Sequence, residues 1–339
     1  MSVQFGLRVP MVGTPQETGA YAAKVEAAGF DFMWMPDTPL LAGLWRDVYM
    51  HLTCAALETK TMRLGPGVTN PITRHPVAVG SAIVTLDEVS DGRADLVVGS
   101  GFSSAYIIGK KAATLKLMRE STELWRSVFS GAKTELGGHE IELKPPHPDL
   151  PIYLAGSGPK ALQLAGEVAD GVLIMVGAAP GCVEWALEQV EIGMARGGRK
   201  REDVRRMLVV NACVDDDKAR AIDLMRPCVG NLCKSRNVEE LFARAGLTVP
   251  DIPSGGKPPY PDLGHAVDWE EAKRFASYVP DDAVEAMIAV GSADEVADHV
   301  RSLTALDIDA IWFRDEGTWA HPDALLKGLS EGVLPQLRA

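Results

Sequence analysis

The sequence predicts an α/β fold, a (β/α)8 barrel of the TIM type with an insertion after its seventh strand. Short apolar segments alternate with longer helical segments along most of the chain. Eight of the apolar segments are hydrophobic on both faces, which is typical of a parallel sheet covered by helices. The chain has 339 residues, whereas an ideal barrel needs about 250, and the excess falls in one stretch.

The expected strands follow one another in chain order, and each consists of an apolar run five to eight residues long. They are Gln4–Val9, Phe30–Met35, Met62–Val68, Ala94–Gly99, Pro151–Ala155, Gly171–Val176, Met207–Val214 and Asp309–Phe313. Helical segments lie between and after them. They are Pro15–Ala28, Asp47–Glu58, Pro76–Val89, Thr114–Phe129, Pro159–Val168, Cys182–Arg196, Asp294–Leu306 and Pro322–Leu334. This repeated order of strand and helix predicts the barrel.

The segment Arg226–Pro280 does not follow the alternation of strands and helices. It contains SGGKPPYPDLGH, which is rich in proline and glycine, and helical pieces such as Val238–Ala245 flank it. We therefore expect residues 1–339 to form a single barrel domain with an insertion at about 226–280. The alternative architecture is a doubly wound sheet in two domains.

The composition excludes several classes of function. Acidic residues outnumber basic ones by 46 to 34, for a formal net charge of −12, which opposes binding to nucleic acid or to an anionic membrane surface. The first residues lack the basic and apolar regions of a signal peptide. The five cysteines form no CxxC pair, which favours a reducing, cytoplasmic location. The histidines show no metal-ligand spacing, so we expect no metal site.

One glycine-rich turn follows the fifth expected strand. Gly156 to Ala161 reads G-x-G-x-x-A between a strand and a helix, the arrangement that places a phosphate at a helix N-terminus. A dinucleotide site also needs an acidic residue at the end of the next strand, and the chain there reads Met175-Val176-Gly177-Ala178. The turn thus predicts phosphate binding without a dinucleotide. A tight turn that binds no ligand is the alternative.

A barrel of this type places its functional residues at the C-terminal ends of the strands. The second strand ends in Asp37 and Thr38, the third runs into the segment Gly65–Pro71, and the fourth into Gly99–Ser103. With the turn after the fifth strand, the third and fourth strand ends make three glycine-rich segments on one rim. Such a rim suits a flat ligand that bears a phosphate and lies against the backbone.

Three longer motifs carry a family resemblance. LGPGVTNPITRHP (Leu64–Pro76), TLDEVSDGRADLVVGSG (Thr85–Gly101) and AGSGPKALQLAGEVADGVL (Ala155–Leu173) resemble the bacterial-luciferase-like superfamily. Within it, the chain is most similar to the coenzyme F420-dependent branch that includes methylenetetrahydromethanopterin reductase. The resemblance covers most of residues 1–215 and the closing strand and helix, and it fades through 226–280.

The resemblance implies a homodimeric oxidoreductase that transfers a hydride between coenzyme F420, bound at the barrel mouth, and a small organic substrate. It also implies a non-proline cis peptide bond between Gly67 and Val68, behind the cofactor ring. Carried over residue by residue, the expected cofactor-binding set is Gly67, Val68, Thr69, Asn70, Gly99, Ser100, Gly101, Ser103, Ala155, Gly156, Ser157 and Gly158.

The chain departs from the family pattern at two positions. Several F420-dependent enzymes have Asp-His at the end of the second strand, and here the pair is Asp37-Thr38. We expect both residues in the catalytic site, with Asp37 either transferring a proton or, ionised, orienting the loop. Phe102 stands where relatives often carry aspartate, which predicts a more apolar wall. Further candidates for substrate contact, each with a purely structural alternative, are Trp45, Arg46, Tyr49, Arg74 and His75.

Two other functions remain open at this point. An FMN-dependent monooxygenase of the same superfamily has the same barrel but uses a flavin that reacts with oxygen. A non-catalytic flavin-binding relative is the third reading, and the intact glycine-rich turn and third-strand motif argue against it.

Overall fold

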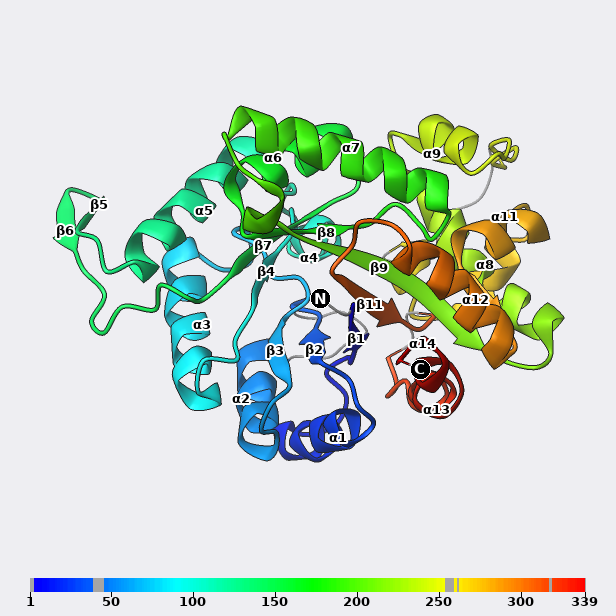
Figure 1. The fold of residues 1–339 in the computed structure, drawn as a ribbon, viewed down its shortest axis with the longest axis horizontal. Helices are drawn as coiled ribbons and strands as arrows, with labels where there is room; N and C mark the ends of the chain where they lie inside the picture. The colour runs from blue at the N-terminus through cyan, green and yellow to red at the C-terminus, as the bar shows by residue number, and fades with distance from the viewer. Residues whose placement is uncertain (1–2, 39–45, 254–258, 261, 317–318, 339) are drawn as a thin grey trace.

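The structure is a computed structural model that describes residues 3–38, 46–253, 259–260, 262–316 and 319–338. In this part of the chain, eight parallel strands form a ring and helices surround it (Figure 1). The predicted (β/α)8 barrel is confirmed. Its strands are β1 (Gln4–Arg8), β2 (Phe32–Met35), β3 (Arg63–Pro66), β4 (Leu96–Val98), β7 (Ile152–Gly156), β8 (Gly171–Ile174), β9 (Arg205–Val214) and β11 (Ala310–Arg314).

The strands are hydrogen-bonded in the order β3-β2-β1-β11-β9-β8-β7-β4. Two isolated parallel bridges, Leu64 to Ala94 and Thr69 to Val98, join β3 to β4 and close the ring. The ten-residue β9 extends beyond the barrel, where its end pairs with a further short strand, β10 (Ala289–Gly291). Strand β10 was not predicted from the sequence, because three residues are too few to show a periodicity.

The helices cover the outside of the ring (Figure 1). Several begin at the caps that their sequences indicate; α1, for example, starts after Thr14 with a capping box to Glu17. The helices that lie wholly or partly outside the insertion are α1 (Pro15–Ala27), α2 (Val48–Glu58), α3 (Pro76–Ser90), α4 (Phe102–Ile107), α5 (Leu115–Phe129), α6 (Pro159–Val168), α7 (Pro180–Arg196), α8 (Lys218–Leu232), α11 (Asp281–Met287), α12 (Ala293–Thr304), α13 (Asp323–Lys327) and α14 (Leu334–Arg338). A π-helical segment, η4 (Gly328–Val333), joins the last two.

The strand side chains alternate between two cores. Those that point outward, such as Leu7 and Phe313, pack under the helices, whereas those that point inward fill the barrel. In the interior, the indole rings of Trp34 and Trp312 lie 5.6 Å apart between centroids. Both faces of the sheet are therefore buried, as the apolar strands predicted.

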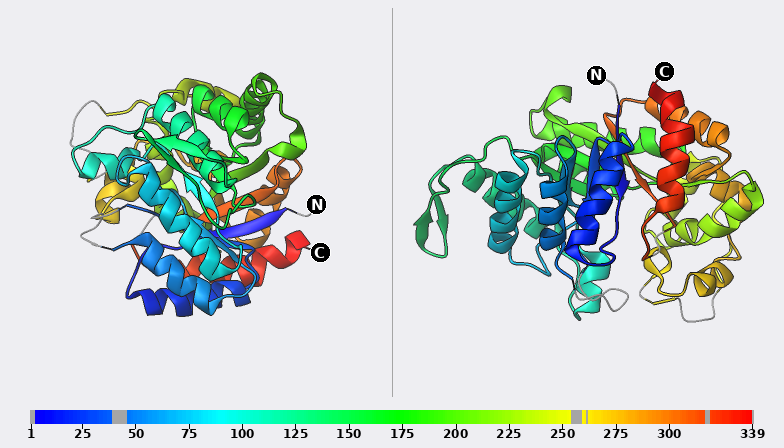
Figure 2. Two further views of the ribbon diagram at one scale, coloured as in Figure 1. Left: turned by 90° about the vertical axis from the view of Figure 1, so that its left-hand side faces the viewer. Right: turned by 90° about the horizontal axis from the view of Figure 1, so that it is seen from below.

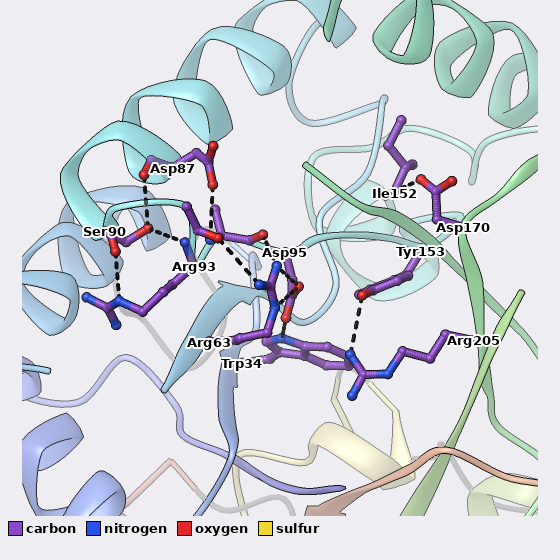
Figure 3. Close-up of polar contacts among 12 residues, drawn as sticks. Trp34, Arg63, Asp87, Ser90, Arg93, Asp95, Ile152, Tyr153, Asp170 and Arg205 are labelled. Carbon is purple, nitrogen blue, oxygen red and sulfur yellow. Dashed lines mark hydrogen bonds and ion pairs between the residues drawn. The ribbon is translucent and has the colours of Figure 1, made fainter. Parts of the chain in front are cut away.

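A polar layer closes the barrel at the N-terminal ends of its strands (Figure 3). The buried carboxylate of Asp95 accepts a hydrogen bond from Trp34 Nε1 at 3.0 Å and one from Arg63 Nε at 2.8 Å. Across the layer, Arg205 donates to the Tyr153 hydroxyl and to the side chain of Gln4. The mouth at the other end is therefore the only open end of this interior in the described residues.

The expected insertion, 226–280, begins inside helix α8, because Arg226 and Pro227 lie within Lys218–Leu232. It contributes α9 (Val238–Arg244), the 3-10 turn η3 (Leu263–His265) and α10 (Trp269–Phe275). Residues 254–258 and 261 of its proline- and glycine-rich stretch lie outside the described residues.

A β-hairpin of β5 (Thr134–Leu136) and β6 (His139–Ile141) projects from the barrel beside α5 (Figures 1 and 2). This hairpin was not predicted from the sequence. Gly137 and Gly138 form its two-residue turn with φ of 58° and 80°, a backbone that a Gly-Gly pair adopts readily. Its strands are short and exposed, so they show no apolar alternation.

Candidate active site

A cavity of about 280 Å3 lies at the C-terminal ends of the strands. Its wall includes residues that follow β2, β3, β4, β7 and β8, residues at the ends of β1 and β11, and one histidine of the insertion. Ten of the residues predicted from the sequence line it: Thr38, Gly67, Val68, Gly99, Ser100, Gly101, Ser103, Ala155, Gly156 and Ser157. The remaining four predicted residues, Asp37, Thr69, Asn70 and Gly158, do not.

The segment after β3 forms one side of the cavity. The peptide bond between Gly67 and Val68 is cis, as the family resemblance implies. A Cβ on Gly67 would lie 2.7 Å from Trp34 Cβ and 3.0 Å from the Trp312 ring. Gly67 is thus required by the close approach of this segment to the barrel interior.

The segment after β4 lies directly against the β3 segment. A Cβ on Gly99 would lie 2.6 Å from Val68 Cγ2. Gly101 has a φ of 74°, and a Cβ there would lie 2.5 Å from Asn70 Cγ. Only glycine fits at these two positions, so the two strand ends present backbone to the cavity here.

Asn70 braces this contact rather than lining the cavity. Its Nδ2 donates to Ser104 Oγ at 3.0 Å, and its Oδ1 accepts from the backbone N–H groups of Ile72 and Thr73. The buried amide thereby fixes both the turn after β3 and the first turn of α4.

The turn after β7 opens towards the N-terminus of α6. Gly158 is the N-cap residue and makes no side-chain cap. The first N–H groups of the helix therefore have no side-chain acceptor at this end. A Cβ on Gly158 would meet nothing within 4 Å, and its φ of −101° suits any residue. The fold therefore has no need of glycine here, whereas a phosphate approaching the helix N-terminus closely would.

Asp37 turns away from the cavity and pairs with Arg74. Its Oδ2 accepts from Arg74 Nε at 2.9 Å and from Thr69 Oγ1 at 2.7 Å, and its Oδ1 from Arg74 Nη2 at 3.1 Å. Arg74 also pairs with Asp47. Burial opposes the charge of Arg74, but the hydrogen bonds to Asp37 and Asp47 outweigh it and raise the pKa of this guanidinium. The pair is a bidentate contact between two ions.

The charged side of the cavity was not predicted from the sequence. Arg8 at the end of β1, Trp312 and Arg314 in β11, and His265 of the insertion all line it. One signal was available: Arg8 lies two residues after Gly6, and Arg314 two after Trp312. Residues at such spacing in a strand point to the same face, here the barrel interior.

The insertion contacts the predicted site through two hydrogen bonds. Ser103 Oγ donates to Asp262 Oδ2 at 2.8 Å, and Asn237 Nδ2 donates to the Ser157 carbonyl at 2.9 Å. Burial opposes the charge of Asp262, but His265 and Ser103 hold the pKa of its carboxyl at about 2, well below the usual range. The insertion is thus fastened to the strand ends after β4 and β7.

The other candidate contact residues are spread around this site. Phe102 lines the cavity and is 72% exposed. Arg46 donates to the Met11 carbonyl, Tyr49 lies under the Arg74 guanidinium, and His75 caps α3. Trp45 lies outside the described residues.

Two classes of site are absent from the described residues. No group of three or more histidine, cysteine, aspartate or glutamate side chains is placed to hold a metal ion. No helix there has the length and the apolar character to span a bilayer.

Comparison with known proteins places these features in context. The family model for luciferase-like monooxygenases matches residues 2–310. A 5,10-methylenetetrahydromethanopterin reductase of Archaeoglobus fulgidus is 31% identical over 302 residues, covering 86% of this chain and 87% of the relative. An F420-dependent glucose-6-phosphate dehydrogenase of Amycolatopsis mediterranei is 25% identical and covers 96% of this chain and 95% of the relative.

A similar solved structure is the coenzyme F420-dependent tetrahydromethanopterin reductase of Methanopyrus kandleri. It superposes with a TM-score of 0.77 at 23% identity and covers 99% of this chain and all of that one. At this identity the likeness concerns the fold of the barrel.

Proposed function

Because the chain belongs to the luciferase-like monooxygenase family, we propose that it is an oxidoreductase that uses coenzyme F420 to exchange a hydride with a small organic substrate. The observation that carries the proposal is the similarity in sequence to F420-dependent relatives along nearly the whole chain. The glycine-lined mouth of the barrel supports it, because the residues there fit a flat ligand that bears a phosphate.

The cofactor-binding residues lie along one arc of the rim. The segments after β3 and β4 would hold the ring between the Val68 side chain and the backbone at Gly67 and Gly99, two positions where a side chain has no room. The turn Gly156–Gly158 and the uncapped N-terminus of α6 would hold the phosphate. Open space at Gly158 is the feature of this chain that fits such a group.

When bound, coenzyme F420 supplies or accepts the hydride. The chain itself positions and shields the reacting molecules. Val68, Met175 and Leu154 give the cavity an apolar wall, which excludes water from the hydride path. Thr38 is the polar side chain at the end of β2 that lines the cavity, and its hydroxyl can donate a hydrogen bond to a substrate oxygen but is too weakly acidic to give up a proton.

The contacts of Asp37 support a positioning role. All three of its hydrogen bonds use the carboxylate as an acceptor, and the group does not line the cavity. We propose that Asp37, as an ion, holds Thr69 and Arg74 at the end of β2. It would thereby fix the segment after β3, which we propose contacts the cofactor ring. Proton transfer by Asp37 would require this pair to break first.

The FMN-dependent monooxygenase is the second candidate, because the family description itself refers to monooxygenases. The names of the curated relatives favour coenzyme F420. A non-catalytic flavin-binding protein is disfavoured because the cavity, the glycine-rich turn after β7 and the glycine-containing segment after β3 are all present.

Titration of the purified protein with coenzyme F420 and, separately, with FMN tests the proposal. Quenching of cofactor fluorescence gives each dissociation constant. We expect binding of F420 in the micromolar range or tighter and FMN binding at least a hundredfold weaker. The reverse order would make the monooxygenase the leading function, and no binding of either would refute both.

We further propose that the protein is a cytoplasmic homodimer. All five cysteines are unpaired, which suits a reducing compartment. Met50 and Leu57 of α2 and Val77 and Val89 of α3 expose apolar side chains on neighbouring helices, which suits an interface. Light scattering on the protein eluting from a sizing column would give the mass of a dimer.

A further inference from the structure

Two arginines project into the barrel mouth from neighbouring strands. In the parallel register of β1 and β11, Leu7 pairs with Phe313, so Arg8 and Arg314 are the next residues on each strand. Leu7 and Phe313 belong to the outer core, and their successors therefore point inward. Both arginines line the cavity, and Arg8 is only 1% exposed.

These side chains carry hydrogen-bond donors without a partner among the described residues. They are Arg8 Nη2, Arg314 Nε and the neighbouring indole nitrogen Trp312 Nε1. The other terminal nitrogen of Arg8, Nη1, pairs with Asp315 Oδ1 at 2.9 Å. A buried donor without a partner costs about 1–3 kcal/mol, and more when it is charged. Three such donors on one wall indicate a binding site for a ligand that carries hydrogen-bond acceptors.

The charge of the cavity wall points the same way. Its described lining contains Arg8, Arg314 and His265 but no carboxylate, although the whole chain carries a net charge of −12. Carboxylates lie behind this wall: Asp315 pairs with Arg8, and Asp262 pairs with His265. Burial, and then the nearby charge of Arg8, lower the pKa of Arg314 to about 10. Arg314 is thus a cation at neutral pH, and the attraction of an anion in the cavity would offset both the burial and the repulsion from Arg8.

The strand order places Arg8 and Arg314 on strands other than those that carry the proposed cofactor residues. The segments after β3, β4 and β7 are adjacent and form one arc of the ring, whereas β1 and β11 lie in the other arc. Between β11 and β7 stand β9 and β8. A phosphate at Gly158 and a ring at Gly67 would therefore leave the arginines free for the second reactant.

We propose that Arg8 and Arg314 bind an oxyanion group of the substrate, a carboxylate or a phosphate. The guanidinium groups supply paired donors for such a group, and Trp312 Nε1 supplies a third. This inference rests on the proposed function, and it defines the substrate class as an organic anion that places its reacting carbon over the cofactor arc.

Fluorine NMR of the F420-saturated protein tests the inference, with trifluoroacetate as the anionic probe and trifluoroacetamide as its neutral counterpart. Saturation with F420 occupies the turn at α6, so that site does not contribute. We expect the protein to broaden the trifluoroacetate signal and to leave the amide signal sharp. Equal broadening of both would overturn the inference. Competition distinguishes the sources: acetate displaces the probe at lower concentration if the site takes a carboxylate, and inorganic phosphate if it takes a phosphate.

Variants show whether the arginines are responsible. In Arg314→Met, the apparent dissociation constant of trifluoroacetate should rise at least tenfold, and Arg314→Lys should retain part of the affinity. The matched control is Arg205→Met, at the opposite end of the barrel, which should bind the probe as the unchanged protein does. Circular dichroism establishes that each variant is folded. Wild-type affinity in folded Arg314→Met would refute the proposed site.

The two proposals fail in different ways. If the protein does not bind F420, the proposed function is refuted, while broadening that depends on Arg314 in the cofactor-free protein still supports the anion site. If F420 binds normally to all three variants but the probe response is the same in each, only the anion site is refuted.

Discussion

The two ends of the barrel use the same residue types for opposite purposes. At the closed end, the Trp34 indole and the Arg63 guanidinium both donate to Asp95 (Figure 3). At the mouth, Trp312 and Arg314 carry nitrogens that have no partner among the described residues. The two indoles are neighbours in the interior, so the difference lies in what surrounds the polar atoms.

This difference separates polar groups that stabilise the fold from polar groups that are available to bind a ligand. A buried polar group that is fully paired specifies the structure, and its loss is costly. A buried cation that lacks partners lowers stability and is retained when it serves binding. Substitutions at the closed end should therefore change the free energy of unfolding, and substitutions at the mouth should change binding.

Asp95→Ala should have the largest effect on stability. It leaves the donors of Trp34 and Arg63 without their acceptor, and breaking a buried pair of this kind costs about 3 kcal/mol. Urea unfolding should show this loss, while the folded fraction binds F420 normally. The matched variant at the mouth, Arg314→Met, should unfold at the same or a higher urea concentration. A loss at Arg314 as large as the one at Asp95 would contradict the comparison.

Asp262 should link the insertion to the mouth in a way that depends on pH. The pKa of this carboxyl is about 2 in the folded protein and about 3.9 in an unfolded chain. The unfolded state thus binds more protons between these values, and the contact stabilises the fold fully above about pH 4. This contribution, about 2 kcal/mol, is lost as the pH falls towards 2.

Urea unfolding of Asp262→Asn measures that contribution. The variant should be less stable than the unchanged protein at pH 7, and the gap should narrow at pH 3. A gap that is equal at both pH values would show that the charge of Asp262 does not hold the insertion.

Gly158→Val should weaken cofactor binding at little cost in stability. Its Cβ would enter open space in the protein but would block the approach of a phosphate to α6. We expect the dissociation constant of F420 to rise at least tenfold, about 1.4 kcal/mol, by fluorescence titration. Gly158→Ala should show a smaller increase. Unchanged affinity in the folded valine variant would place the phosphate elsewhere.

Asp37→Asn should have the smallest effect on cofactor binding and turnover. Asparagine keeps an acceptor for Thr69 but loses the charge and one hydrogen bond to Arg74, so we expect a loss of about 2 kcal/mol in stability and less than a tenfold fall in turnover. A proton-transfer role is typically worth about 10²–10⁴ in rate. A hundredfold fall in turnover with unchanged stability would establish that role instead.

The barrel could be predicted from the sequence because its strands repeat one pattern. Each predicted strand overlaps an observed one, since burial on both faces makes every strand a continuous apolar run. The hairpin β5–β6 was missed because its side chains are exposed and only its Gly137-Gly138 turn carries a signal.

The positions of the glycines in the site could be predicted from the sequence. Which of them the fold itself requires could not. Gly101 is required by a positive φ and by Asn70, whereas Gly158 is not required by the fold. The roles of Asp37 and Arg314 could not be predicted, because they depend on contacts between strands far apart in the chain. Arg74 follows Asp37 by 37 residues, and Arg314 meets Arg8 through the register of β1 and β11.

The ring of strands is joined least continuously between β3 and β4, where two isolated bridges form a seam. Elsewhere neighbouring strands share continuous ladders, but here Leu64 and Thr69 fasten the edges and the backbone around Gly67 turns towards the cavity between them. The proposed cofactor residues after β3 and β4 lie on this seam, so a ligand bound there would contact both strand edges. Binding there would add contacts across the part of the ring that has the fewest strand-to-strand pairs.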